Sequence, residues 1–158
     1  MKVTVVIPCY NQAHFLKDAV ESVKNQTFKD FEIIVVDDGS PDNTSEVANK
    51  LGVRCIRQVN RGLSAARNTG IRAAKGQYIL PLDADDKIDP EFLAKTLPYI
   101  KNYDIVSTWL RTFGNENRTW GSDKLEPTYG LMKSQNQDRK STRLNSSHLK
   151  LSRMPSSA

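Results

Sequence analysis

Cysteine and histidine are scarce in this sequence of 158 residues. The two cysteines, Cys9 and Cys55, match no metal-binding spacing, so we expect reduced thiols in a cytosolic protein. Cys9 has no evident partnering base and is expected to be a packing residue. The two histidines, His14 and His148, belong to no metal or nucleophile motif. These absences argue against thiol catalysis and against a cysteine–histidine metal site.

Long hydrophobic runs are absent as well. The apolar stretches, such as residues 3–8 and 33–36, are far shorter than the roughly 20 residues that cross a bilayer. The chain enters a strand pattern at once, without the pattern of a signal peptide. We therefore expect a cytoplasmic protein, placed at the cytoplasmic membrane face only through further segments of a longer enzyme.

Two glycine-rich phosphate-binding motifs are also missing. No Gly-x-Gly-x-x-Gly follows the first strand pattern, and no Gly-x-x-x-x-Gly-Lys-Ser/Thr occurs, which argues against a dinucleotide-binding Rossmann domain and a P-loop. Residues 8–12 contain neither glycine nor lysine. A nucleotidyltransferase, which carries a glycine-rich basic loop at this point, is therefore disfavoured.

The net charge of +5 is unevenly distributed. Residues 139–158 contain no acidic residue and five basic ones, Arg139, Lys140, Arg143, Lys150 and Arg153. Without these five, the chain has 18 basic and 18 acidic residues. Since nucleic-acid binding requires a basic face on the folded domain, we expect no nucleic-acid partner.

Apolar runs alternate with stretches of helical periodicity, which predicts an α/β fold. The expected strands are residues 3–8, 32–36, 53–58, 78–82 and 104–109, and the helices between them lie within residues 15–23, 42–50, 63–74 and 90–100. Asp42, Asn43 or Thr44 is expected to cap the second of these helices. This order predicts a mostly parallel sheet with helices on both faces. Ligands of such sheets bind at the carboxyl ends of the strands, near a switch in strand order.

An acidic segment follows the fourth expected strand. Asp83, Asp85 and Asp86 place three carboxylates within four residues, where they repel one another unless a cation compensates them. Carboxylate and phosphate oxygens are the ligands that Mg²⁺ or Mn²⁺ prefers. The segment therefore predicts a divalent metal beside the phosphates of a nucleotide, although taken alone it is also compatible with a solvated turn.

Two further segments are expected near the same edge of the sheet. Asp37 and Asp38 follow the second strand in an Asp-Asp-Gly-Ser sequence, which is either an ordinary turn or an acceptor for a base N–H group. Arg67 lies on a helix of small residues and is either a surface cation or a group that fixes a carboxylate or phosphate.

These motifs together resemble the family 2 glycosyltransferases of GT-A fold. The resemblance rests on residues 3–11, on residues 25–28 and 35–40, on residues 62–70, and on residues 82–86 with Pro90 and Phe92. It covers roughly residues 1–110, with the motifs in the expected order. It implies an inverting transferase that moves a sugar from a nucleotide-diphosphate donor, usually a UDP-sugar, to an acceptor hydroxyl.

The resemblance also implies roles for single residues. Pro8 and Tyr10 would border the base, and Asp38 would contact its N–H group. Arg67 would support the nucleotide site, and Asp83 would be the residue of the Asp-x-Asp motif on the ribose side.

The implied cofactor is Mn²⁺ or Mg²⁺. Asp85 would be its ligand, with Asp86 as a second candidate. The metal would act as a Lewis acid that neutralises the leaving diphosphate.

The general base that the resemblance implies is not identified. The late carboxylates are Glu116, Asp123, Glu126 and Asp138, and none has the expected sequence context. The acceptor, whether a carbohydrate, a lipid carrier or a protein, is likewise not indicated. A non-catalytic nucleotide-sugar-binding module therefore stays open as the alternative.

Three regions follow from this. Residues 1–110 form the expected nucleotide-sugar-binding core, residues 111–138 a partial acceptor-side region or loop, and residues 139–158 a disordered basic tail. The tail from Lys140 resembles translated adapter or vector sequence. We expect a truncated enzyme that holds the donor side of the site, with membrane association only through segments outside this chain.

Overall fold

The computed structural model describes residues 2–103, 105–108, 110–112, 119–120 and 150–153. The chain divides into two compact units, one formed by residues 1–107 with 149–158 and the other by residues 108–148. In the second unit, β6 (Leu110–Arg111) pairs with β7 (Thr119–Trp120) in antiparallel fashion. Most of the predicted region 111–138, with all four late carboxylates, lies outside the described residues.

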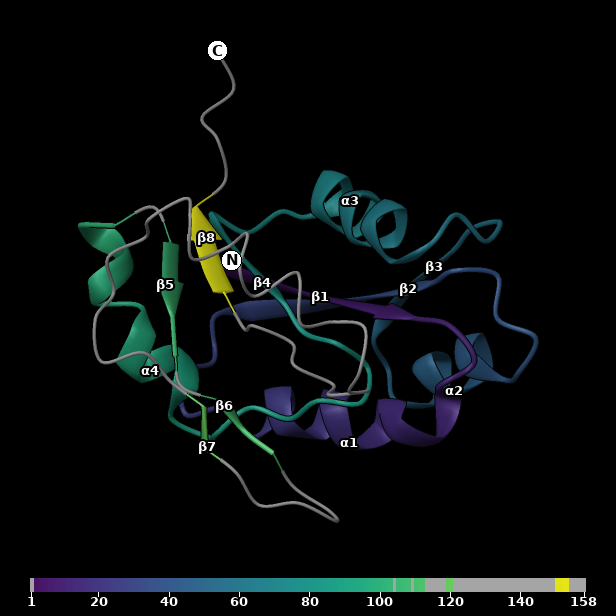
Figure 1. Ribbon diagram of the computed structural model, residues 1–158, viewed down its shortest axis with the longest axis horizontal. Helices are drawn as coiled ribbons and strands as arrows, with labels where there is room; N and C mark the ends of the chain where they lie inside the picture. Colours follow the sequence, from purple (N-terminus) through teal and green to yellow (C-terminus); the bar gives the residue numbers. More distant parts are fainter. Residues whose placement is uncertain (1, 104, 109, 113–118, 121–149, 154–158) are drawn as a thin grey trace. The chain divides into compact units, whose positions relative to one another are not determined.

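The first unit is built on a six-stranded sheet in the order β3-β2-β1-β4-β8-β5 (Figure 1). Its strands are β1 (Val3–Cys9), β2 (Phe31–Asp37), β3 (Arg54–Arg57), β4 (Tyr78–Pro81), β5 (Ile105–Ser107) and β8 (Lys150–Arg153). The first four are parallel, and β8 runs antiparallel to its neighbours β4 and β5. The predicted mostly parallel sheet is confirmed.

Strand β1 is the centre of this sheet, and all seven of its residues are buried. Val3, Val5 and Ile7 pack into one hydrophobic cluster, and Val6 packs into a second cluster. Because successive side chains of a strand point to opposite faces, both faces of β1 are covered. This explains why the strand appears in the sequence as a continuous apolar run.

Helices cover both faces of the sheet. They are α1 (Ala13–Lys24), α2 (Thr44–Lys50), α3 (Leu63–Ala73) and α4 (Phe92–Thr96), followed by the 3₁₀ turn η1 (Tyr99–Lys101). Residues of α1, α2 and α4 join the larger cluster, whereas Ala66 of α3 joins the smaller one. Accordingly, α3 lies on one side of the strands and α1 and α2 on the other (Figure 1). No helix in the described part of the chain is both long and apolar enough to cross a bilayer.

Close packing of α3 depends on one glycine. A Cβ atom added to Gly70 would lie 2.2 Å from Cγ1 of Val6, well inside van der Waals contact. Ala66, one turn earlier, is 1% exposed. The helix therefore approaches β1 more closely than larger residues would permit, which brings its other side chains near the edge of the sheet.

The strand order places a switch point beside β1. The chain proceeds outward from β1 through β2 to β3 and then returns to β4 on the opposite side of β1. In open α/β sheets, the crevice at the carboxyl ends of strands on either side of such a switch is the usual ligand site. Here these ends are the segments after Cys9 and after Pro81.

The tail differs from the expectation of disorder at four residues. Residues 150–153 form β8, with Leu151 opposite Val106 of β5 and Ser152 opposite Ile79 of β4. The backbone groups along β4 and β5 need partners, and an extended segment between them supplies these. Lys-Leu-Ser-Arg carries little apolar character of its own, so its pairing was not visible in the sequence.

Candidate active site

The acidic segment lies directly after β4. The backbone N–H of Leu82 donates to the carbonyl of Val6, which extends the pairing of β4 with β1 by one residue. The N–H of Asp86 then donates to the carbonyl of Asp83 at 3.0 Å and closes a turn. Ala84 is buried, whereas Asp83 and Asp85 are only partly covered. The turn thus places carboxylates at the switch point of the sheet.

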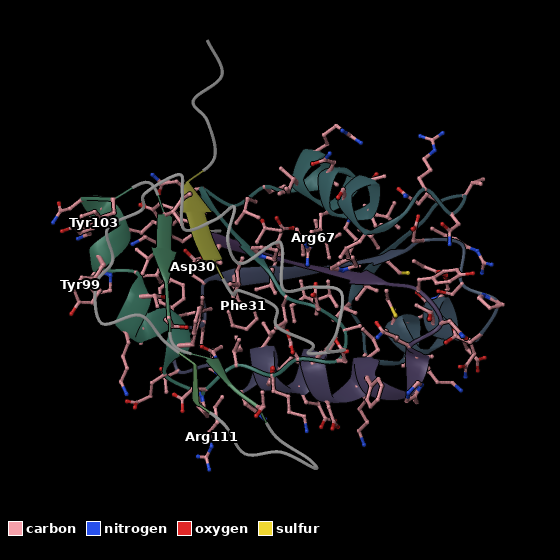
Figure 2. All side chains as sticks on the ribbon, in the orientation of Figure 1. Asp30, Phe31, Arg67, Tyr99, Tyr103 and Arg111 are labelled. Atoms are coloured by element: carbon pink, nitrogen blue, oxygen red, sulfur yellow. The ribbon has the colours of Figure 1, made fainter. Side chains whose placement is uncertain are left out.

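Arg67 compensates part of this negative charge. Its NH2 nitrogen lies 2.5 Å from Oδ1 of Asp83, and the side chains are 34% and 25% exposed. In Figure 2, Arg67 lies between α3 and the strands. The contact joins the helix on one face of the sheet to the acidic segment. This agrees with the interpretation of Arg67 as a group that fixes a carboxylate, rather than as a surface cation. The predicted roles of both residues toward a nucleotide remain predictions.

Asp86 is the most deeply buried carboxylate of the segment, at 8% exposed. Burial, together with the negative charges of Asp83 and Asp85, raises its pKa to about 7, and Arg67 opposes this rise. Its Oδ2 atom is buried without a hydrogen-bond partner among the described residues. A buried acceptor left unpaired lowers the stability of the folded protein, and a bound cation or donor group would restore it.

Asp85 is linked to the end of β1. Nε2 of Gln12 lies 3.4 Å from its Oδ2 atom, and Gln12 directly precedes α1. The two strand ends on either side of the switch point are therefore connected through side chains.

These carboxylates fit a divalent cation whose coordination is completed by the phosphates of a nucleotide. The described residues contain no group of three or more histidine, cysteine or carboxylate side chains arranged to hold a metal. Mg²⁺, however, is commonly held by one or two carboxylates together with substrate phosphates. The partly exposed Asp85 and the unpaired Oδ2 of Asp86 match that smaller set.

Asp38 holds the loop that leads into α3. Its Oδ1 atom accepts from Nε2 of Gln58 at 2.7 Å and from the backbone of Arg61 at 2.9 Å, and its Oδ2 atom accepts from the backbone of Gly62 at 2.8 Å. Only 3% of Asp38 is exposed. Three of the roughly four acceptor positions of a carboxylate are thus already used. The predicted contact of Asp38 with a base N–H stays a prediction.

Gly39 and Gln58, which lie beside Asp38, shape the same loop. Gly39 has φ +72°, and an added Cβ atom would lie 2.8 Å from the backbone nitrogen of Asn60. Only glycine therefore permits the loop to approach so closely. Gln58, which the sequence did not single out, also accepts from Oγ1 of Thr69 at 2.6 Å and so ties the loop to α3.

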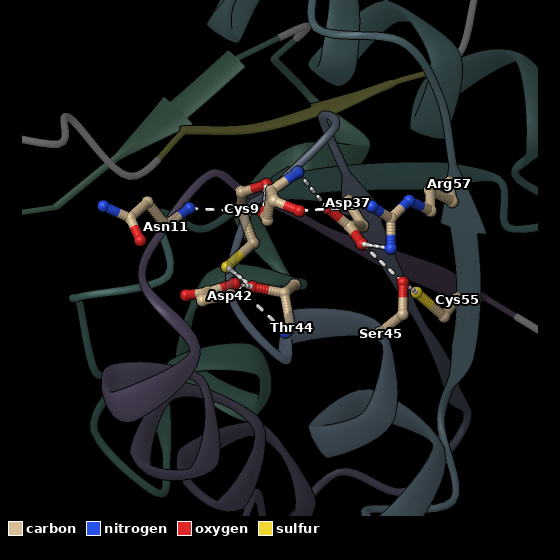
Figure 3. A network of polar contacts seen from close by, with 9 residues as sticks. Cys9, Asn11, Asp37, Asp42, Thr44, Ser45, Cys55 and Arg57 are labelled. Carbon is tan, nitrogen blue, oxygen red and sulfur yellow. Dashed lines mark hydrogen bonds and ion pairs between the residues drawn. The ribbon is translucent and has the colours of Figure 1, made fainter.

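Asp37 is structural. It is fully buried, accepts from the backbone of Ser40 at 2.8 Å and from the hydroxyl of Ser45, and lies 3.6 Å from NH1 of Arg57 (Figure 3). These partners satisfy both of its oxygens. The motif therefore contains one carboxylate that stabilises the turn after β2 and one that organises the next loop.

The thiols lie within the same network, where each contacts a hydroxyl group. Sγ of Cys9 is 3.5 Å from Oγ1 of Thr44, and Sγ of Cys55 is 3.8 Å from Oγ of Ser45 (Figure 3). Burial raises the pKa of both thiols, which keeps them protonated. Both cysteines are free, and the packing role expected for Cys9 agrees with its burial.

Asp42 caps two helices, of which the sequence indicated only the second, α2. Its Oδ2 atom accepts from the first N–H of α1, at Ala13, over 2.9 Å, and its Oδ1 atom accepts from the backbone of Thr44 in α2 over 3.1 Å. Burial opposes the charged form, but the hydrogen bonds from Thr44 and Ala13 outweigh it and lower the pKa of Asp42. One carboxylate thus orients both helices that begin at this edge.

The two residues predicted to border the base differ in exposure. Pro8 is buried within β1, whereas Tyr10, just beyond the strand, is 50% exposed. Asn11, the next residue, has φ +54° and donates its N–H to Oγ of Ser40 at 3.2 Å. The Tyr10 ring is therefore accessible at the end of β1, on a turn tied to the segment after β2.

The chain is similar to known glycosyltransferases. The sequence model of glycosyl transferase family 2 matches residues 4–157. EpsJ of Bacillus subtilis (strain 168), named as an uncharacterized glycosyltransferase, is 36% identical over 138 residues, which are 83% of this chain and 40% of EpsJ. The chain thus spans well under half the length of this relative.

Two solved structures are similar in fold. S. aureus TarS 1–349 in complex with UDP-GlcNAc gives a TM-score of 0.62 at 30% identity, covering 66% of this chain and 33% of that one. The mannosyltransferase PcManGT from Pyrobaculum calidifontis, in complex with GDP-Man and Mn²⁺, gives 0.60 at 24% identity, covering 67% and 34%. At that identity, the second likeness bears on the fold alone.

Proposed function

The chain belongs to glycosyl transferase family 2, and we propose that it binds a nucleotide-sugar donor at the carboxyl ends of β1, β2 and β4. The donor class is a UDP-sugar, and the sugar passes to an acceptor hydroxyl with inversion at the anomeric carbon. The complex of TarS with UDP-GlcNAc supports the choice of donor class.

One observation carries the proposal. Asp86 is a nearly buried carboxylate with one oxygen that no described residue hydrogen-bonds, next to two further carboxylates and one arginine, at the switch point of the sheet. Such an arrangement is unfavourable in the isolated protein and becomes favourable when a cation and a diphosphate arrive together. A structural turn would have no need of a desolvated, unpaired oxygen.

Each side chain has a proposed task. The exposed ring of Tyr10, together with Pro8, borders the base, and Asp38 offers its remaining acceptor position to a base N–H. Asp83, oriented by Arg67, faces the ribose. Since Arg67 also lowers the charge of the acidic segment, it reduces repulsion between that segment and the donor phosphates.

Asp85 and Asp86 are the proposed metal ligands, with Mn²⁺ or Mg²⁺ as the cation. When bound, the cation would stabilise negative charge on the leaving diphosphate. In the transfer itself, the acceptor oxygen forms a bond to the anomeric carbon while the bond from that carbon to the diphosphate oxygen breaks. The electron pair passes to the diphosphate, and the hydroxyl proton passes to a base, for which no residue among those described is assigned.

Release of UDP tests this proposal. The chain is incubated with UDP-GlcNAc and Mn²⁺ in the absence of an acceptor, and hydrolysis is followed as free UDP. Metal-dependent UDP release that is lost in Asp85→Ala and kept in Glu21→Ala, an exposed carboxylate on α1, supports a transferase site. Binding without release would favour a non-catalytic nucleotide-sugar-binding module, and absence of both binding and release would overturn the proposal.

A further inference from the structure

Gln26 is a fully buried polar residue that the proposed site does not use. It lies two residues beyond the end of α1, and its amide joins that helix to the chain that follows the acidic segment. Its Nε2 atom donates to the carbonyls of Ser22, at 3.2 Å, and Asp89, at 2.6 Å. Its Oε1 atom accepts from the backbone N–H of Leu93 at 2.9 Å. Both amide hydrogens and the carbonyl oxygen are thus engaged with backbone groups.

Two neighbours of Gln26 hold the same stretch of backbone. Oγ of Ser22 accepts from the N–H of Ile88 at 3.2 Å, and the N–H of Thr27 donates to the carbonyl of Pro90 at 2.8 Å. Together, residues 22–27 bind backbone groups at four positions between residues 88 and 93. We name these contacts the α1 clamp.

Apolar packing fixes the same stretch. Ile88 and Leu93 are 5% and 0% exposed and belong to the cluster that contains Leu16 and Val20 of α1. On the other side, Leu82 is bound to β1 through its backbone. The acidic segment and the following Lys87 therefore form a span of five residues, 83–87, between the fixed residues Leu82 and Ile88.

We propose that Gln26 is a positioning residue of the donor site, because the α1 clamp sets where Asp85 and Asp86 stand at the switch point. The inference rests on the proposed function, since it concerns the carboxylates assigned to the cation. Its physical basis is chain length. A span of five residues has little freedom, so a shift of the backbone at Ile88 moves the carboxyl groups two and three residues earlier.

This role differs from that of an ordinary buried hydrogen bond. Any such bond contributes to the stability of the whole domain. A positioning residue additionally affects the geometry of the folded site. Groups that orient metal ligands through hydrogen bonds change metal affinity about 10- to 100-fold when they are removed. The test must therefore separate the geometry of the folded state from global stability.

Two substitutions and one matched control make this separation. Gln26→Met keeps the length of the side chain and removes all three hydrogen bonds, and Gln26→Glu keeps an acceptor for Leu93 while removing both donors. The control is Thr4→Val. Thr4 is also fully buried, donates to Oε1 of Glu32 at 2.6 Å and accepts from the N–H of Gly76 at 2.9 Å, but it lies near the amino end of β1.

The first measurement is amide hydrogen exchange, which needs neither metal nor nucleotide. At a temperature where every variant is folded, Gln26→Met should increase exchange in residues 83–93 by about 10-fold or more and leave β1 and β2 near the wild-type rates. Thr4→Val should not accelerate exchange selectively in residues 83–93. Unchanged exchange there in Gln26→Met overturns the inference.

The second measurement is the affinity for UDP with Mn²⁺ and with EDTA. Gln26→Met should reduce the gain in affinity that Mn²⁺ provides by about 10-fold, with Gln26→Glu between it and the wild type. Thr4→Val, even with a similar fall in melting temperature, should keep the gain. If Gln26→Met keeps the full Mn²⁺ gain, the inference is wrong. If the wild type shows no Mn²⁺ gain while exchange in residues 83–93 responds as expected, the α1 clamp stands and the proposed function fails.

Discussion

Arg67 of α3 and Asp83 of the segment after β4 form an ion pair that joins the helix on one face of the sheet to the acidic segment at its edge. Asp83 is one of three carboxylates in four residues, and Arg67 is the cation that opposes the rise in the pKa of Asp86. The pair therefore stabilises the acidic segment before any ligand arrives.

Replacement of Arg67 by methionine should destabilise the protein at pH 8 by about 1 to 2 kcal/mol, between the values for exposed and buried ion pairs, because both partners are partly exposed. The expected loss is measured by urea unfolding with EDTA present. Arg72→Met is the control, since Arg72 is exposed on the same helix and contacts the Thr69 hydroxyl at 3.5 Å rather than a carboxylate. An equal effect of both substitutions would contradict the role given to Arg67.

Burial of Asp86 predicts a specific pH dependence. Its pKa is raised from 3.8 to about 7 in the folded protein, so the folded state binds this proton more tightly than the unfolded state. The stabilising effect of the protonated form is complete below about pH 4 and is lost as the pH rises through 7. Asp86→Asn should therefore stabilise the metal-free protein at pH 8 by about 1 to 2 kcal/mol and have a smaller effect at pH 4.5.

Asp18 provides the opposite case. It is exposed, and a hydrogen bond and ion pair with Lys87 lower its pKa. Asp18→Asn should give no stabilisation at pH 8. Thermal melts of both variants in EDTA at the two pH values measure this, and a stabilisation by Asp86→Asn that does not vary with pH would refute the account of its burial.

Gly70 sets the approach of α3 to β1. Gly70→Ala should destabilise the protein by about 1 to 3 kcal/mol, because the new methyl group would overlap the side chain of Val6. The double variant with Val6→Ala removes both Val6 atoms that the methyl group meets, at 2.2 and 3.2 Å, and leaves the contact with Cγ2 of Val36 at 3.2 Å. Its loss of stability should be clearly smaller than the sum of the two single losses, and simple additivity would mean that the contact is not the cause.

Asp42 is the cap of two helices, so Asp42→Ala should lower the free energy of unfolding by about 1 to 2 kcal/mol. Because its pKa is lowered in the folded protein, this contribution is present above about pH 4 and is lost as the pH falls below it. Asn43→Ala is the matched control, since Asn43 precedes α2 but makes no side-chain capping bond. Unfolding of both variants at pH 7 decides which residue is the cap.

The sequence was sufficient for features that depend on burial and on chain order. β1 appears as an apolar run because both of its faces are covered, and the alternation of strands and helices predicted that the segments after β2 and β4 lie near one edge. The acidic segment stood out because three carboxylates in four residues are unusual whatever surrounds them.

The features that the sequence did not reveal are contacts between distant residues. Gln26 and Leu93 are 67 positions apart, and a glutamine after a helix carries no signal that its amide will be buried. Asp42 was visible as a cap for α2, but its bond to Ala13 depends on how α1 packs. Asp38 was predicted to face a ligand, whereas three groups of its own chain occupy most of its acceptor positions.

The affinity for UDP measured by calorimetry with Mn²⁺ and with EDTA tests the central claim most directly. The wild type should bind at least about 10-fold more tightly with Mn²⁺, Asp85→Ala should lose this gain, and Glu21→Ala should keep it. Equal affinity of the wild type with and without Mn²⁺, or a full gain in Asp85→Ala, would contradict the assignment of the acidic segment as the cation and diphosphate site.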